Sequence, residues 1–93
     1  MTKQLKITIT KGDVQKTDDR YNATFYCPIH QALQRNRIPV EAVGVNCFRL
    51  MNDPNEYSLP ESIMDVAWLS SKDWHKAIGR SFTVVVDASL VRK

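Results

Sequence analysis

Apolar and polar residues alternate at both ends of the chain. The alternating apolar positions are Leu5, Ile7 and Ile9 near the N-terminus, and Phe82, Val84 and Val86 near the C-terminus. Successive side chains of a β-strand point to opposite faces, so a period of two places each set on one face. The pattern predicts a half-buried strand at each end, with Val85 on the outer face of the second.

A helical pattern begins at Pro28. Proline suits the first helical position, because the N–H that it lacks would have no partner there. The apolar side chains fall on one stripe and the polar ones on the other faces: Ile29, Ala32 and Leu33 against His30, Gln31, Gln34 and Arg35. Pro39 is predicted to stop the helix, since the residue before a proline favours extended geometry.

The segment between the first strand and this helix contains one local motif. Thr10 stands three residues before Asp13, a weak capping box that predicts one helical turn through Val14. Residues 16–25 combine charges with no periodicity and are predicted to form a loop. Loops of this length often carry function in small domains.

The middle of the chain, Val40 to Met51, is predicted to be one strand. One face carries Val43, Val45, Cys47 and Met51, and the other carries Phe48 and Leu50. Apolar residues on both faces are typical of a strand that is covered on both sides. Residues 52–55 form a turn cluster of Asn, Asp and Pro, and a short strand is expected near Tyr57.

A second helix is predicted to begin at Pro60. Its apolar stripe consists of Ile63, Val66, Ala67, Trp74 and Ile78. A break is expected near Ser70 and Ser71, and Gly79 suits the position just past the end of a helix.

These elements give the order strand, helix, strand, short strand, helix, strand. We therefore expect a single α+β domain over residues 1–93. Its sheet would be mainly antiparallel, with three to four strands and two helices on one face. The ferredoxin-like arrangement is compatible with this order.

Composition places the chain among ordinary globular proteins. The 93 residues carry a net charge of +3, with 43% hydrophobic and 25% charged residues. No apolar run is long enough for a membrane span, and the N-terminus has no pattern of a secretory signal. Two cysteines without a secretory signal indicate free thiols in a reducing compartment, so we expect a cytoplasmic protein. Because no apolar run could span a bilayer, we expect no membrane partner.

Cys27 and His30 are the residues closest to recognisable chemistry. With Cys47 and His75 they supply four potential zinc ligands, but two of these stand alone and far apart in the sequence. A catalytic cysteine needs a base and an orienting group, and no third residue has a recognisable spacing. We therefore interpret Cys27 as a partly buried capping residue and His30 as a solvated one. No metal, no cofactor and no enzymatic activity are expected.

Two sets of residues are candidates for binding. Met64 and Trp68 lie four apart and off the core stripe, and both types are enriched at protein interfaces. With the loop residues Arg20, Tyr21 and Phe25 they form a hypothetical partner-binding surface. The alternative is a nucleic-acid interface that uses basic side chains on helix faces. These are Arg35, Arg37, Lys72, Lys76 and Arg80.

Four segments together resemble a group of small proteins encoded by tailed bacteriophages and prophages: GDVQK, YCPIHQAL, LPESIMDVAWLSSKD and RSFTVVVD. In that group a Cys-Pro-Ile/Val sequence opens a helix, although a small residue is expected where this chain has His30. The resemblance implies a viral origin and supplies no activity. From that origin and the lack of catalytic signatures we expect a non-enzymatic accessory protein in the cytoplasm of a bacterial host. It would bind and modulate a host protein, for example a defence complex such as a CRISPR effector. Self-association is left open.

Overall fold

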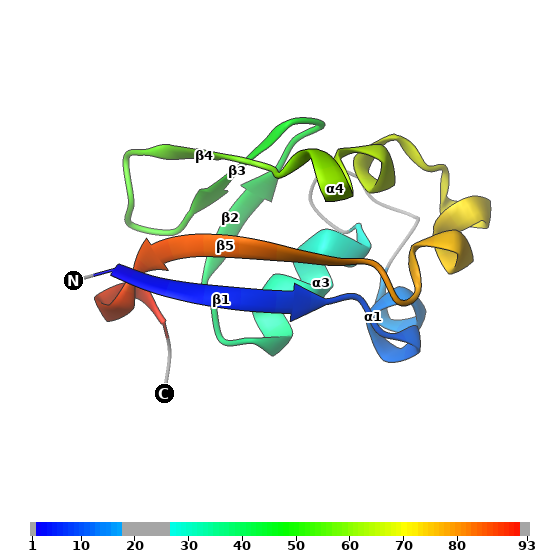
Figure 1. Cartoon of the computed structure of the whole chain (residues 1–93), viewed down its shortest axis with the longest axis horizontal. Coiled ribbons are helices and arrows are strands. Elements are labelled where there is room, and N and C mark those ends of the chain that lie inside the picture. The colour runs from blue at the N-terminus through cyan, green and yellow to red at the C-terminus, as the bar shows by residue number, and fades with distance from the viewer. Residues whose placement is uncertain (1, 18–26, 92–93) are drawn as a thin grey trace.

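The computed structural model describes residues 2–17 and 27–91 (Figure 1). Its elements, with η for 3-10 helices, are β1 (Thr2–Thr8), α1 (Lys11–Lys16), α3 (Pro28–Arg35), β2 (Val40–Val43), β3 (Cys47–Leu50), β4 (Glu56–Ser58), α4 (Glu61–Met64), η1 (Asp65–Trp68), η2 (Ser71–Ala77), β5 (Ser81–Asp87) and η3 (Ala88–Leu90). The α+β class is confirmed. Most of the predicted loop lies outside the described residues, together with Arg20, Tyr21 and Phe25.

The strands at the two ends of the chain pair with each other. β1 and β5 are antiparallel, from Thr2 opposite Asp87 to Thr8 opposite Ser81, and run side by side in Figure 1. The predicted inner positions of β5 are all buried, and Val85 is exposed on the opposite face. Both terminal strands therefore confirm the period-two prediction.

The predicted strand from Val40 to Met51 is wrong, because the segment folds back on itself. β2 and β3 are antiparallel strands joined by residues 44–46, and the Gly44 N–H donates to the Cys47 carbonyl at 2.7 Å. Glycine and asparagine, which occur here as Gly44 and Asn46, favour turns. Val45 and Met51 are consequently exposed, and the face predicted for them does not exist.

The strands form two sheets instead of one. β1 and β5 make a two-stranded sheet, and β2, β3 and β4 make a three-stranded antiparallel sheet in that order. Every pairing between described strands is antiparallel. A ferredoxin-like fold contains parallel βαβ units, so this arrangement is a different one.

The predicted turn before the first long helix is confirmed as α1. The Thr10 hydroxyl accepts a hydrogen bond from the Asp13 N–H at 3.2 Å, and the Asp13 carboxylate accepts one from the Thr10 N–H at 2.9 Å. These two bonds are the complete capping box.

Helix α3 begins as predicted and ends before Pro39. Cys27 is its N-cap and Pro28 its first residue. At the other end, the Arg37 N–H donates to the Gln34 carbonyl at 2.9 Å and the Ile38 N–H to the Leu33 carbonyl at 3.0 Å. This pair of bonds is a Schellman motif, which needs a left-handed backbone at the residue after the cap. Arg37 supplies it with φ 65.

The second predicted helix is three short pieces, mostly of 3-10 type. α4 and η1 are separated from η2 at Leu69 and Ser70, which confirms the predicted break. Burial repeats every three residues: Ile63 and Val66 are buried in the first part, and Trp74 and Ala77 in the second. A 3-10 helix has three residues per turn, which explains this period.

The end of this segment differs from the prediction in one residue. Ile78, placed on the apolar stripe, is exposed, because η2 ends at Ala77 and Ile78 is its C-cap residue with extended backbone. Gly79 has φ +91 and occupies the predicted position past the helix end.

The buried side chains form one hydrophobic cluster. It draws on both sheets, on α3 and on the helical segments between β4 and β5. No helix in the described part of the chain has both the length and the apolar character required to cross a bilayer.

Candidate functional site

Cys27 and His30 both lie inside the protein. Cys27 is 4% exposed and His30 is 7% exposed. Cys27 occupies the predicted N-cap position, but its side chain makes no capping hydrogen bond. The prediction that His30 is solvated is wrong. The N-terminal turn of α3 packs into the core, so position 30 is covered although it lies off the apolar stripe.

Burial shifts both groups towards their neutral forms. Desolvation raises the pKa of the Cys27 thiol, and the N–H groups of His30 and Ile29 oppose this only in part. Desolvation lowers the pKa of His30. A nucleophilic cysteine needs the opposite arrangement, an accessible thiolate beside a cationic group. Within residues 2–17 and 27–91, no three potential ligand side chains lie close enough to hold a metal ion.

The burial of Cys27 predicts slow thiol labelling. At pH 8, we expect Ellman's reagent to modify Cys27 at least about tenfold more slowly than Cys47, because Cys27 is buried and protonated and Cys47 is half-buried. The single variants Cys47→Ser and Cys27→Ser isolate the two thiols. Equal rates in the folded variants would show that Cys27 is accessible.

Trp68 is the most exposed large hydrophobic side chain in the described part of the chain, at 74%. Met64 is only half-exposed and packs against the core. Residues four apart in a 3-10 helix are separated by about 120° around the axis. The structure therefore places Trp68 on the surface as predicted, but Met64 does not share its face.

An ion pair lies on the same face of η1 as Trp68. Asp65 precedes Trp68 by three residues, so the two side chains are aligned along the helix. Asp65 pairs with the Arg80 guanidinium, which also donates to the Ser62 carbonyl at 3.1 Å. These bonds connect the segment before β5 to α4 and η1, and they position the helical piece that carries Trp68.

The five basic residues of the alternative interface are separated in the structure. Arg35 and Arg37 are at the C-terminal end of α3, and Lys72 and Lys76 are on η2, which lies at the right-hand end of Figure 1. Lys76 pairs with Asp73 at 3.4 Å. Lys72 and Lys76 do not share a face, because η2 has three residues per turn.

Arg35 has a structural partner. Its Nε donates to Asp13 Oδ1 at 2.9 Å and its Nη2 to the Thr8 carbonyl at 2.6 Å. These bonds link α3 to α1 and to the end of β1. Arg35 and Arg80 are therefore both occupied by contacts within the protein, whereas Arg37 and Lys72 make no ion pair with a described residue.

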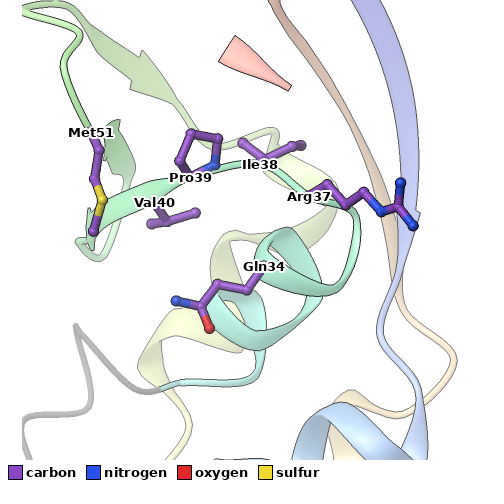
Figure 2. A pocket seen from close by; sticks show the side chains of 6 residues that line it. All are labelled: Gln34, Arg37, Ile38, Pro39, Val40 and Met51. Atoms are coloured by element: carbon purple, nitrogen blue, oxygen red, sulfur yellow. The ribbon is translucent and has the colours of Figure 1, made fainter. Parts of the chain in front are cut away.

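Two cavities beside Gln34 were not predicted from the sequence. The first has a volume of about 330 Å³ and is lined by Gln34, Arg37, Ile38, Pro39, Val40 and Met51 (Figure 2). The second has about 340 Å³ and is lined by Asp13, Lys16, Gln31, Gln34 and Arg35. The hairpin between β2 and β3 brings Met51 next to Pro39. In a single strand over residues 40–51 the two ends would be far apart, so the predicted strand gave no reason to expect this contact.

Comparisons with family models, with curated proteins and with solved structures find no match to this chain. The resemblance to bacteriophage proteins therefore remains an expectation from the sequence.

Proposed function

We propose that this chain is a non-enzymatic accessory protein that binds another protein through a surface centred on Trp68. The observation that carries the proposal is the 74% exposure of that indole on a short helical piece. Tryptophan is the residue type most enriched among interface positions that dominate binding energy. Its large apolar ring and single N–H suit a contact that is partly dry and partly polar.

The surroundings of Trp68 support this role. Asp65 is aligned with Trp68 along η1 and pairs with Arg80, so charged groups lie on the same face of η1, as expected at the rim of an interface. Trp68 contributes little to the core, so the stability of the fold does not explain why a tryptophan occupies this position. Val66, two residues earlier, is buried and serves the core instead.

The bacteriophage resemblance supplies the class of partner. A small viral protein without recognisable catalytic residues commonly acts by binding, and we propose a protein of the bacterial host, with a defence complex as one example. The buried and neutral state of Cys27 and His30 supports binding over covalent catalysis. The nucleic-acid alternative receives less support, since Arg35 and Arg80 are engaged within the protein.

Trp68→Ala is expected to weaken binding strongly without destabilising the fold. Loss of an exposed anchor should weaken partner capture by at least about thirtyfold, or roughly 2 kcal/mol. The free energy of unfolding should change by less than about 0.5 kcal/mol, because the side chain is mostly solvated. Capture from host lysate measures the first quantity, and urea denaturation the second.

Site-specific crosslinking provides the control. The photoreactive residue p-benzoylphenylalanine at position 68 should crosslink one host protein, whereas the same residue at Val85, another exposed apolar position, should not. Crosslinks to a second copy of this chain alone, or identical products from both positions, would contradict the proposal.

A further inference from the structure

The two cavities beside Gln34 lie next to each other, because Gln34 lines both. Each falls in the range that holds one or two side chains of a ligand. Together they surround the C-terminal end of α3, on the side of α1 and on the side of β2. We refer to them as the Gln34 groove.

One end of the Gln34 groove is apolar. Ile38 and Val40 are buried beneath it, Pro39 is half-buried, and Met51 is 44% exposed. In Figure 2 Met51 and Arg37 lie on opposite sides of this cavity, with Gln34 between them. A methionine that is free to move adapts its shape to an aliphatic guest. No aromatic side chain is among the described residues that line the two cavities, so this described lining offers no ring on which a nucleobase could stack.

The lining is also basic. Among the described lining residues, Lys16, Arg35 and Arg37 contribute cations and Asp13 is the only acid. The charge of Asp13 is balanced by its bidentate contact with Arg35. Lys16 and Arg37 make no ion pair with any residue that the structure describes. The described lining therefore carries an excess of positive charge, which is complementary to a carboxylate.

Arg37 occupies a position that favours a different residue. It is the left-handed residue of the Schellman motif, with φ 65. Glycine adopts this conformation without strain, and an arginine pays a conformational cost there. Strained backbone of this kind is held by the surrounding structure and clusters at functional sites. The Arg37 side chain makes no ion pair with a described residue and extends away from Met51 and Gln34 in Figure 2, so it has to turn back to reach a ligand in the cavity.

We infer that the Gln34 groove docks an acidic segment of a protein partner, in which an aliphatic side chain lies next to a carboxylate. The aliphatic group enters the cavity between Met51 and Pro39. The carboxylate is held by Arg37, which reorients towards it, and by Lys16 where the segment continues past Gln34. The inference rests on the proposed function, since it assigns a second contact to the same kind of partner.

The probe is an amidated and acetylated peptide, Gly-Ser-Glu-Leu-Asp-Leu-Glu-Ser-Gly, titrated into the isotopically labelled full chain and followed by NMR. We expect saturable shifts at the Gln34 side-chain amide, the Arg37 Nε–H and the Met51 methyl. A peptide with Gln and Asn in place of the acids should bind at least about tenfold more weakly, because charged hydrogen bonds are lost. Exchange of the two leucines for glycine should remove the Met51 shift.

Arg37→Gly separates binding from folding. It should weaken the acidic peptide about tenfold and also raise the urea midpoint, because glycine relieves the left-handed strain. Arg37→Asn, which is neutral and tolerates φ > 0, should weaken binding to a similar extent. Lys72→Gln removes one charge from η2 and should leave the titration unchanged.

Three results would overturn the inference: no shift at 5 mM peptide, equal binding of the neutral peptide, or stronger competition by a ten-residue oligothymidylate than by the acidic peptide. Trp68→Ala should not alter this titration. A negative titration with intact crosslinking at position 68 would reject the Gln34 groove alone, and the reverse result would reject the Trp68 surface alone.

Discussion

Replacing Phe48 with alanine is expected to lower the free energy of unfolding by about 3–5 kcal/mol. Phe48 belongs to β3, the central strand of the three-stranded sheet, and its side chain is buried. Its ring stacks on Tyr57 of β4, with centroids 5.5 Å apart and an interplanar angle of 19°. The substitution would remove this contact and leave a cavity inside the core. Such a loss is a large share of the stability of a small domain.

Urea denaturation measures the effect, and the pattern of controls identifies its cause. Phe48→Leu keeps most of the buried volume and should cost roughly 1–2 kcal/mol. Met51→Ala, at an exposed position after the same strand, should change the free energy of unfolding by less than about 0.5 kcal/mol. A cost for Phe48→Ala no larger than that for Met51→Ala would show that β3 does not form the centre of this sheet.

The strands at the two ends could be predicted because their pattern is local. Each alternates over several residues, and each has one buried face, so the period of two is preserved from sequence to structure. The hairpin between β2 and β3 could not be recognised from alternation alone. The turn itself contains an apolar residue, Val45, so the apolar pattern continues through the point where the chain reverses direction. Gly44 and Asn46 permit this reversal, but they are too weak a signal to outweigh the pattern.

The helical segments show a different limit. Over four to seven residues, the spacing of apolar positions fits an α-helix, with 3.6 residues per turn, and a 3-10 helix, with 3.0, about equally well. The interruption at Leu69 and Ser70 leaves pieces too short for a stable α-helix, since helix nucleation is costly. The resulting period of three decides which of Met64 and Trp68 is exposed, and that choice is not contained in the local pattern.

Tertiary contacts account for the remaining misses. His30 is buried although it lies off the apolar stripe of its own helix, and Arg35 contacts Asp13 across 22 residues. From the sequence Arg35 is a candidate contact for nucleic acid, and its partner Asp13 is too far away in the chain to be paired with it by local spacing. The Gln34 groove also depends on contacts between segments that are distant in the sequence. Its lining comes from α1, from α3 and the residues that follow it, and from the two ends of the β2–β3 hairpin.

The contact between Arg35 and Asp13 forms the centre of a small polar network. The Asp13 side chain is 2% exposed, and that of Arg35 is 41% exposed. Burial alone would raise the pKa of Asp13. The hydrogen bonds and charge of Arg35, together with the bonds from Thr10, outweigh burial and lower the pKa. The carboxylate is therefore ionised in the folded protein and depends on its arginine.

Arg35→Gln is expected to destabilise the protein by about 2–4 kcal/mol at pH 7, because it leaves a buried carboxylate without its cationic partner. Arg80→Gln is the matched control. The two arginines are about equally exposed, at 41% and 42%, but the Asp65 side chain is 62% exposed whereas that of Asp13 is 2% exposed, so Arg80→Gln should cost at most about 1 kcal/mol. Urea denaturation of the two variants at pH 7 compares a buried pair with a surface pair in one protein.

The cost of Arg35→Gln should shrink in acid. In the native sequence the pKa of Asp13 is lower in the folded state than in the unfolded state, so its ionisation stabilises the fold above the unfolded pKa. That contribution is lost as the pH falls through the folded pKa, over roughly pH 5 to pH 2. The variant lacks the contribution at every pH, because desolvation then dominates and raises the pKa of Asp13.

The free energies of unfolding of the two proteins, plotted against pH, should therefore converge near pH 2.5. NMR titration of the Asp13 carboxyl carbon should show a higher pKa in the variant. A difference in stability that stays constant from pH 7 to pH 2.5 would mean that Arg35 acts through packing of its side chain and not through the charge of Asp13.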